Sequence, residues 1–158
     1  MDGSRWAHLA QALSLGSRAL RKRITRLTRP YQLTDTEFLF LCCCRGEGVP
    51  VAQGQIGDSL GLSPAQVSGI AEKLRSSGLV TMKRGTADRR KQFCILTEQG
   101  EQLEHRLADE LRVDLPKCGI RIGDVDLDHL LFLLDKLIAT KLTATDPTSD
   151  TTSDTTDM

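Results

Sequence analysis

The chain has 158 residues, of which 39% are hydrophobic, so it can bury the core of one domain, is too short for two well-packed domains, and is not expected to be disordered. Its formal net charge is zero, but the first 30 residues carry seven cations and one anion, residues 63–97 carry seven and two, and residues 98–158 carry six and fourteen. Such an asymmetry orients a protein on a polyanion such as nucleic acid even when the total charge is neutral.

The first 30 residues predict a long amphipathic helix that ends at Pro30. Apolar side chains recur along one stripe of this helix, and basic side chains cover the rest of its second half. The stripe consists of Trp6, Leu9, Leu13, Leu20, Ile24 and Leu27, and the basic residues are Arg18, Arg21, Lys22, Arg23, Arg26 and Arg29. Three interpretations of these cations are open: they form a solvated face, they contact the flanking nucleic-acid backbone, or they pair with the acidic distal helices. We favour the last two together.

The segment Asp35–Arg45 predicts a second helix that is apolar on nearly every side, which is typical of a central helix buried all round. It contains three consecutive cysteines, Cys42, Cys43 and Cys44. Consecutive helical residues point roughly 100° apart, so these three thiols cannot all reach one metal ion. Buried cysteine behaves as a small hydrophobic residue.

The spacing of the other cysteines and of the histidines predicts no metal site. Cys94 lies in a predicted strand and Cys118 in a connector, no Cys-x-x-Cys occurs, and the histidines lack zinc-ligand spacing (His8, His105 and His129). With no signal peptide and no apolar run long enough to cross a membrane, we expect a cytoplasmic protein with reduced thiols and no cofactor. Oxidant sensing by one of the five cysteines is an open alternative, which requires an exposed thiol of low pKa.

Two short helices around a tight turn follow, Val51–Leu62 and Ser63–Ser77, in the order of a helix-turn-helix. Ser63 suits the N-cap of the second helix, Pro64 suits its first position, and Gly78 suits its C-terminal end. Its apolar residues share one face that should be buried (Val67, Ile70, Ala71 and Leu74).

The opposite face of this second helix is small and polar in its first turns, which allows a helix to enter the DNA major groove. The candidate DNA contacts on it are Ser63, Ala65, Gln66, Ser68 and Lys73.

The segment Gly78–Thr97 predicts a β-hairpin with strands at Leu79–Arg84 and Gln92–Leu96. Val80 and Met82 share one face, as do Phe93 and Ile95, which suits two paired strands with one side against the core. Five cations crowd the tip beside a single anion: Lys83, Arg84, Arg89, Arg90 and Lys91, with Asp88. Because like charges repel and a polyanion relieves that repulsion, we favour phosphate or minor-groove contact over a merely solvated tip.

The remaining chain predicts two helices and a tail. Thr97 can cap a long helix whose leucines recur every four residues until Pro116, and Lys117–Gly123 forms a connector. The last helix, Asp124–Lys141, has a wide apolar face, which packs on its own core or on another chain. The segment Thr143–Met158 consists almost entirely of Thr, Ser and Asp and is expected to be a disordered acidic tail.

Several of these segments resemble the MarR family of bacterial transcription regulators. The resemblance lies in the strand Leu79–Arg84, the wing motif Asp88-Arg89-Arg90 and the helix start Leu96-Thr97-Glu98-Gln99-Gly100, and it continues upstream through Leu33-Thr34, Leu60-Gly61-Leu62-Ser63 and Val67-Ser68. It covers roughly residues 6–142. Gly69 departs from the family, many members of which carry a larger, often basic, residue there.

The resemblance implies one domain, residues 1–142, that is mostly α with a small β-hairpin wing. A winged helix-turn-helix DNA-binding region, residues 31–97, is flanked by N- and C-terminal dimerisation helices, residues 6–30 and 98–142. The resemblance also implies that Asp88 braces Arg90 for insertion into the minor groove, with Arg89 as a substitute or a phosphate contact. Lys83, Arg84 and Lys91 complete the predicted DNA-binding set.

The function that the resemblance implies is that of a homodimeric repressor that binds a palindromic double-stranded DNA operator and responds to a small-molecule effector. An enzyme is not expected, because the sequence contains no nucleophile elbow, phosphate-binding glycine loop, metal box or paired carboxylates. Two alternatives of the same fold are an oxidant-sensing regulator and a winged helix that binds protein instead of DNA.

Overall fold

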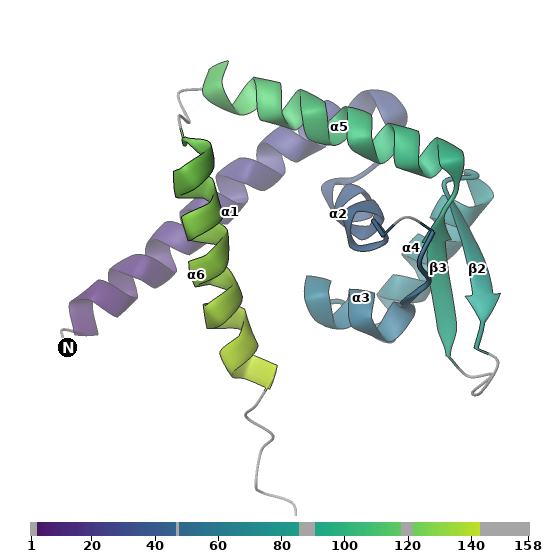
Figure 1. Ribbon diagram of the computed structural model, residues 1–158, viewed down its shortest axis with the longest axis horizontal. Helices are drawn as coiled ribbons and strands as arrows, with labels where there is room; N and C mark the ends of the chain where they lie inside the picture. The colour runs from purple at the N-terminus through teal and green to yellow at the C-terminus, as the bar shows by residue number, and fades with distance from the viewer. Residues whose placement is uncertain (1–2, 47, 86–90, 118–121, 143–158) are drawn as a thin grey trace, which may run out of the picture. The chain divides into compact units, whose positions relative to one another are not determined.

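The computed structural model describes residues 3–46, 48–85, 91–117 and 122–142, with backbone alone for 139–142. It is mostly helical with one small antiparallel sheet, which confirms the predicted fold class (Figure 1). The chain divides into two compact units, residues 1–115 and 116–158. The elements are α1 (Gly3–Thr28), the 3-10 helix η1 (Arg29–Tyr31), α2 (Asp35–Cys43), β1 (Val51–Ala52), α3 (Gln53–Leu60), α4 (Pro64–Ser76), β2 (Val80–Arg84), β3 (Gln92–Leu96), α5 (Glu98–Lys117) and, in the second unit, α6 (Asp124–Leu142).

The sheet has three strands in the order β1-β3-β2, one more than the hairpin expected from sequence. The prediction of a helix from Val51 is wrong for its first two residues, because Val51 and Ala52 pair with Cys94 and Phe93 of β3. Helix α3 therefore begins at Gln53. The β-branched Val51 favours an extended backbone. The hydrogen bonds that stabilise this conformation come from the partner strand β3, which is far away in the sequence.

The two wing strands β2 and β3 pair as predicted, with one side against the core. Cross-strand partners share a face, and Val80 pairs with Leu96 while Met82 pairs with Cys94. These four residues are buried or half-buried in the core. The β3 residues on the core face are thus Cys94 and Leu96. Phe93 and Ile95 share a face, as predicted, but it is the face opposite the one that carries Val80 and Met82.

Helix α2 lies at the centre of the first unit and contacts α1, α3 and α4. Every residue from Asp35 to Cys44 is buried or half-buried, which confirms the prediction of a helix without a solvent face. Each neighbouring helix contributes fully or almost fully buried side chains to the core around it, among them Ile24 of α1, Ile56 of α3, Leu74 of α4 and Leu107 of α5. The helix is therefore a shared packing partner of the other helices in this unit.

Two buried carboxylates join helices through ion pairs. Glu37 of α2 accepts from the Lys73 Nζ of α4 at 2.7 and 2.9 Å. The side chain of Glu104 in α5 is fully buried and accepts hydrogen bonds from the guanidinium of Arg45, which lies just after α2. The distance between Arg45 Nε and Glu104 Oε2 is 3.1 Å. Each buried charge thus has a cationic partner whose own side chain remains about half exposed.

Thr97 connects the start of α5 to the junction between α4 and β2. Its Oγ1 accepts from the Gly100 N–H at 3.0 Å, which confirms the predicted cap, and donates to the Gly78 carbonyl at 2.6 Å. The backbones approach so closely that a Cβ at Gly100 would lie 2.0 Å from the Leu79 carbonyl oxygen. Helix α5 runs through Pro116 and ends at Lys117, one residue later than predicted.

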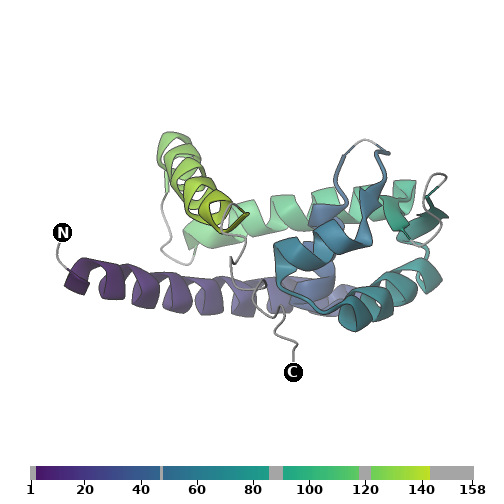
Figure 2. The same cartoon turned by 90° about the horizontal axis from the view of Figure 1, so that it is seen from below.

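Apolar side chains remain exposed on both terminal helices. Every residue of α1 from Gly3 to Lys22 is exposed, and this part of the helix projects beyond the core of its unit (Figures 1 and 2). On it lie Trp6, Leu9, Leu13 and Leu20, and on α6 lie Val125, Leu127, Leu130, Leu131, Phe132, Leu133, Leu137 and Ile138. Exposed apolar side chains in such number are typical of helix faces that pack against another surface.

None of the helices in the described ranges is both long enough and apolar enough to cross a membrane. The segment 143–158, for which disorder was predicted, lies outside the described residues, as do Cys118 and most of the predicted connector.

Candidate nucleic-acid interface

Helix α4 begins and ends as its sequence predicts. Ser63 Oγ accepts from the Gln66 N–H at 3.4 Å, and Gln66 Oε1 accepts from the Ser63 N–H at 2.9 Å, with Pro64 in the first turn. At the other end Gly78 has the left-handed φ of 73°, so the chain turns sharply into β2.

The two faces of α4 also differ as predicted. Val67, Ala71 and Leu74 are buried, and Ile70 is half-buried. The other face is exposed and small or uncharged in its first two turns (Ala65, Gln66, Ser68 and Gly69). A helix of this kind can approach the edges of base pairs closely in the major groove.

The turn between α3 and α4 sets the two helices close together. Gly61 ends α3 with a left-handed φ of 64°, and the Leu62 N–H donates to the Gly57 carbonyl at 2.9 Å. A Cβ at Gly57 would lie 3.2 Å from both Leu62 O and Val67 Cγ2. Close packing at this point holds α4 against α3 and leaves its polar face outward.

The described wing cations stand at the end of the hairpin away from the core. Lys83 and Arg84 end β2, Lys91 precedes β3, and all three side chains are exposed. The register pairs Arg84 with Gln92, so these two share the face that packs on the helices, whereas Lys83 points to the opposite face.

The wing tip carries the predicted minor-groove motif. Asp88, Arg89 and Arg90 lie outside the described residues, so the brace and the inserted arginine stay predictions. The strands that flank the tip are closed by a hydrogen bond from the Gly85 N–H to the Lys91 carbonyl at 2.9 Å.

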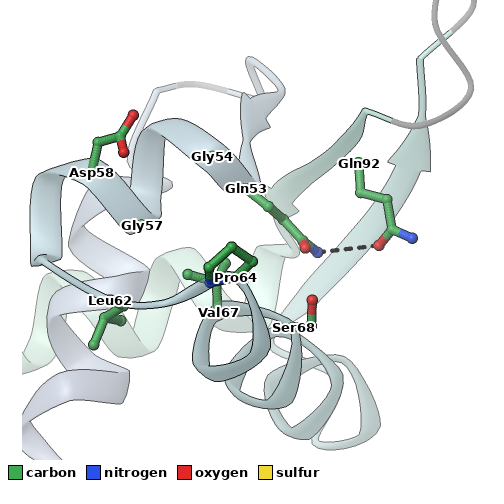
Figure 3. Close-up of a pocket in the computed structure, with 9 residues that line it drawn as sticks. All are labelled: Gln53, Gly54, Gly57, Asp58, Leu62, Pro64, Val67, Ser68 and Gln92. Atoms are coloured by element: carbon green, nitrogen blue, oxygen red, sulfur yellow. Dashed lines mark hydrogen bonds between the residues drawn. The ribbon is translucent and has the colours of Figure 1, made fainter. Parts of the chain in front are cut away.

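A groove of about 330 Å³ separates the wing from the first turns of α3 and α4 (Figure 3). Across it the Gln53 Nε2 of α3 donates to the Gln92 Oε1 of β3 at 3.3 Å, and Ser68 of α4 points toward this pair. The groove therefore brings Ser68, a predicted DNA contact on α4, next to the outer end of the wing strands. Its lining residues are Gln53, Gly54, Gly57, Asp58, Leu62, Pro64, Val67, Ser68 and Gln92.

Lys73, a predicted DNA contact, is held by the protein itself. Besides its two bonds to Glu37, its Nζ lies 3.5 Å from the Gln32 carbonyl oxygen. Glu37 also accepts from the Thr34 N–H at 2.9 Å and so caps α2. This arrangement gives Lys73 a structural role between α2 and α4, and its contact with DNA stays a prediction.

None of the thiols in the described ranges combines an exposed position with a lowered pKa. Cys42 and Cys43 are half-buried, and Cys44 and Cys94 are buried. A hydrogen bond with Cys44 lowers the pKa of Cys94, whose side chain is 0% exposed. Burial, together with the charge and hydrogen bond of Glu104, raises the pKa of Cys42 to about 12, and burial raises the pKa of Cys43. A hydrogen bond to Cys94 and burial raise the pKa of Cys44. A protonated, buried thiol is a poor nucleophile. Among the same residues, no three His, Cys, Asp or Glu side chains converge in a way that could hold a metal ion.

The sequence interpretation missed three residues of this region: Glu37, Gln53 and Gln92. Glu37 could have been found from the spacing Thr34-x-x-Glu37, which is a capping-box pattern. Gln53 and Gln92 have no local signal, because they meet only when β1, α3 and the wing have packed.

Comparison with known proteins identifies similar chains. Residues 33–92 match the model of the MarR family. The chain is 32% identical over 113 residues to the HTH-type transcriptional repressor NicR of Pseudomonas putida, which covers 68% of this chain and 67% of NicR.

Two solved structures have the same fold. The transcriptional regulator BldR of Sulfolobus solfataricus is 20% identical, with a TM-score of 0.76 over 89% of this chain and 99% of that one. CouR of Rhodococcus jostii RHA1, solved with bound p-coumaroyl-CoA, is also 20% identical, with a TM-score of 0.70 over 82% and 91%.

Proposed function

This chain belongs to the MarR family of transcription regulators, and on that premise we propose that it is a repressor that binds double-stranded DNA as a homodimer in the cytoplasm. The observation that carries the proposal is the exposed, small and uncharged face of α4 beside a wing with exposed cations at its outer end. These two surfaces match the two parts of a duplex that a winged helix contacts: base edges in the major groove and the phosphate backbone.

We assign the DNA contacts accordingly. Ser63, Ala65, Gln66 and Ser68 face base edges and sugar-phosphate at the start of α4, and Lys83, Arg84 and Lys91 face phosphates. At the tip, Asp88 braces Arg90 in the minor groove, with Arg89 beside it. Lys73 supports α4 through Glu37 and contributes its remaining surface to the backbone contact.

The homodimer follows from the apolar faces of α1 and α6, which one chain leaves in water. A two-fold dimer places two copies of α4 on successive half-sites, roughly 34 Å apart, so the operator is palindromic. We expect a solution mass of twice the 17.4 kDa of one chain. A 17.4 kDa species at micromolar concentration would contradict the dimer.

Repression and effector response are supported by relatives. NicR is named as a transcriptional repressor, and the CouR structure holds p-coumaroyl-CoA. We propose that this chain blocks a promoter by occupying it and that a small molecule, of a class that the residues do not identify, releases it.

Salt-dependent binding to duplex DNA tests the central proposal. Genomic fragments retained by the purified protein supply the operator, and affinity is then measured over a range of salt concentrations. Each lost phosphate contact flattens the log–log slope by roughly 0.9, so Arg84→Ala should flatten it. Arg106→Ala removes the same charge from an exposed position on α5 and should leave the slope unchanged. If the wild-type protein retains no DNA fragment and binds duplex without salt dependence, the winged helix serves protein contact instead.

A further inference from the structure

We propose that Gln53, the first residue of α3, is a positioning residue that fixes the wing relative to α4 for DNA binding. Its side-chain Nε2 lies 3.3 Å from Gln92 Oε1, 3.4 Å from Met82 Sδ and 3.8 Å from Cys94 Sγ. One amide on the helix-turn-helix thus contacts both strands of the wing. The proposal rests on the proposed function, because it concerns how the wing meets DNA.

The backbone before Gln53 brings its amide to this place. Val51 and Ala52 pair with Cys94 and Phe93, so the chain enters α3 already bonded to β3. These pairs end at Phe93. The Gln53 side chain extends the attachment one residue further out, to Gln92 (Figure 3).

Gln92 occupies the last pair of the described ladder, opposite Arg84. Arg84 shares its face and is therefore directed toward the side of the wing on which the helices pack. A contact at this pair controls where the outer end of the wing, with Arg84 and Lys91, lies relative to α4. Without it, the wing is held to the helices by contacts nearer the core, namely the β1–β3 pairs and the packing of Val80, Met82, Cys94 and Leu96.

The contacts of Gln53 favour this role over direct contact with DNA. An amide nitrogen has two hydrogens, and three acceptors within the protein already compete for them. The side chain is half-buried in the groove, whereas the predicted contacts Ser68 and Lys91 are exposed. Gln53 is therefore placed to act on DNA through the wing.

The matched substitutions Gln53→Met and Gln102→Met test the idea in the full-length protein. Methionine keeps the length of the side chain and its packing against sulfur but removes the donor. Gln102 is an exposed glutamine on α5 that bonds Glu98 within its own helix. We expect Gln53→Met to weaken operator binding by roughly three- to tenfold, as loss of one hydrogen-bonded anchor implies, and Gln102→Met to have no effect.

Two further readouts separate positioning from general stability. Amide hydrogen exchange of Gly85, whose N–H bonds Lys91, should accelerate in Gln53→Met while exchange in α4 stays unchanged. Gln92→Met, which removes the acceptor at an exposed position, should reproduce both effects. This exchange measurement uses the free protein and so is independent of whether the proposed DNA function is correct.

A double-variant cycle decides whether the effect passes through the wing. In an Arg84→Ala/Lys91→Ala background, Gln53→Met should change operator affinity by a smaller factor than in the wild-type background, because two of the cations that it positions are gone. Equal losses in both backgrounds, or unchanged Gly85 exchange, would overturn the proposal. A wild-type protein without salt-dependent DNA binding would instead overturn the proposed function.

Discussion

Replacing Arg45 by methionine should destabilise the protein more than neutralising its partner Glu104. The Glu104 side chain is 0% exposed, whereas Arg45 is 53% exposed. Removing the arginine leaves a carboxylate in the interior with the Cys42 thiol at 3.5 Å and the His105 Nε2 at 3.8 Å. Removing the negative charge by Glu104→Gln leaves a cation that water can solvate.

The magnitudes follow from this difference in burial. Loss of one partner of a buried ion pair costs about 3–5 kcal/mol, and the thiol donor that remains reduces this to about 2–4 kcal/mol for Arg45→Met. Glu104→Gln keeps the shape of the side chain and buries a neutral amide, which costs about 0.5–1.5 kcal/mol. The two variants should therefore differ by at least about 1 kcal/mol, although they break the same contact.

Urea unfolding followed by helical circular dichroism measures both values, at one fixed protein concentration because a dimer is expected. Arg112→Met is the matched control, since Arg112 pairs with Asp109 on the surface of α5 with both side chains more than 70% exposed. It should change the unfolding free energy by less than about 0.5 kcal/mol. If Glu104→Gln proved as destabilising as Arg45→Met, burial of the carboxylate would not be the origin of the cost.

Three other predictions concern the packing at α5, the titration of a thiol and the wing tip. Gly100→Ala should lower the free energy of unfolding by more than about 2 kcal/mol, because its Cβ would lie 2.0 Å from the Leu79 carbonyl oxygen. Gly69→Ala, with open space around it, should raise that free energy by up to about 1 kcal/mol. Thermal or urea unfolding measures both, and equal effects would contradict the close approach at Gly100. The pKa of Cys42 is raised from 9.0 to about 12 in the folded state, so its contribution to stability is complete below pH 9 and is lost as the pH rises toward 12. The unfolding free energy of Cys42→Ala should therefore fall less than that of the wild type over this range. Parallel plots of unfolding free energy against pH would refute the shift. Arg90→Ala should weaken operator binding by about 1–3 kcal/mol without changing the melting temperature, and an unchanged dissociation constant would remove Arg90 from the interface.

Much of the helix-turn-helix was predictable because its signals are local. Ser63 and Thr97 cap helices through hydrogen bonds within three residues, and Gly78 ends α4 through its own backbone conformation. The buried face of α4 follows from the helical period alone. Such features depend on side chains a few positions apart, so the linear order of residues contains them.

The candidate site was only partly predictable for the opposite reason. The short strand β1 was predicted as helix, because a segment of two residues carries almost no periodic signal. Its pairing partners, Cys94 and Phe93, belong to a strand that is distant in the sequence. The assignment of Lys73 as a DNA contact did not foresee Glu37, which lies 36 positions earlier in the chain. The sequence around a lysine does not show whether its charge pairs with a phosphate or with a buried carboxylate.

The amino-acid sequence alone determined the order of helices, the wing, the distribution of charge and the family, because these depend on composition, spacing and short motifs. Tertiary structure decided which polar groups remain available to a ligand: it buried Glu37 and Glu104 against cations and brought Gln53 to the wing. The physical reason is that burial and pairing change the energy of a polar group by several kcal/mol and are set by neighbours that only packing supplies.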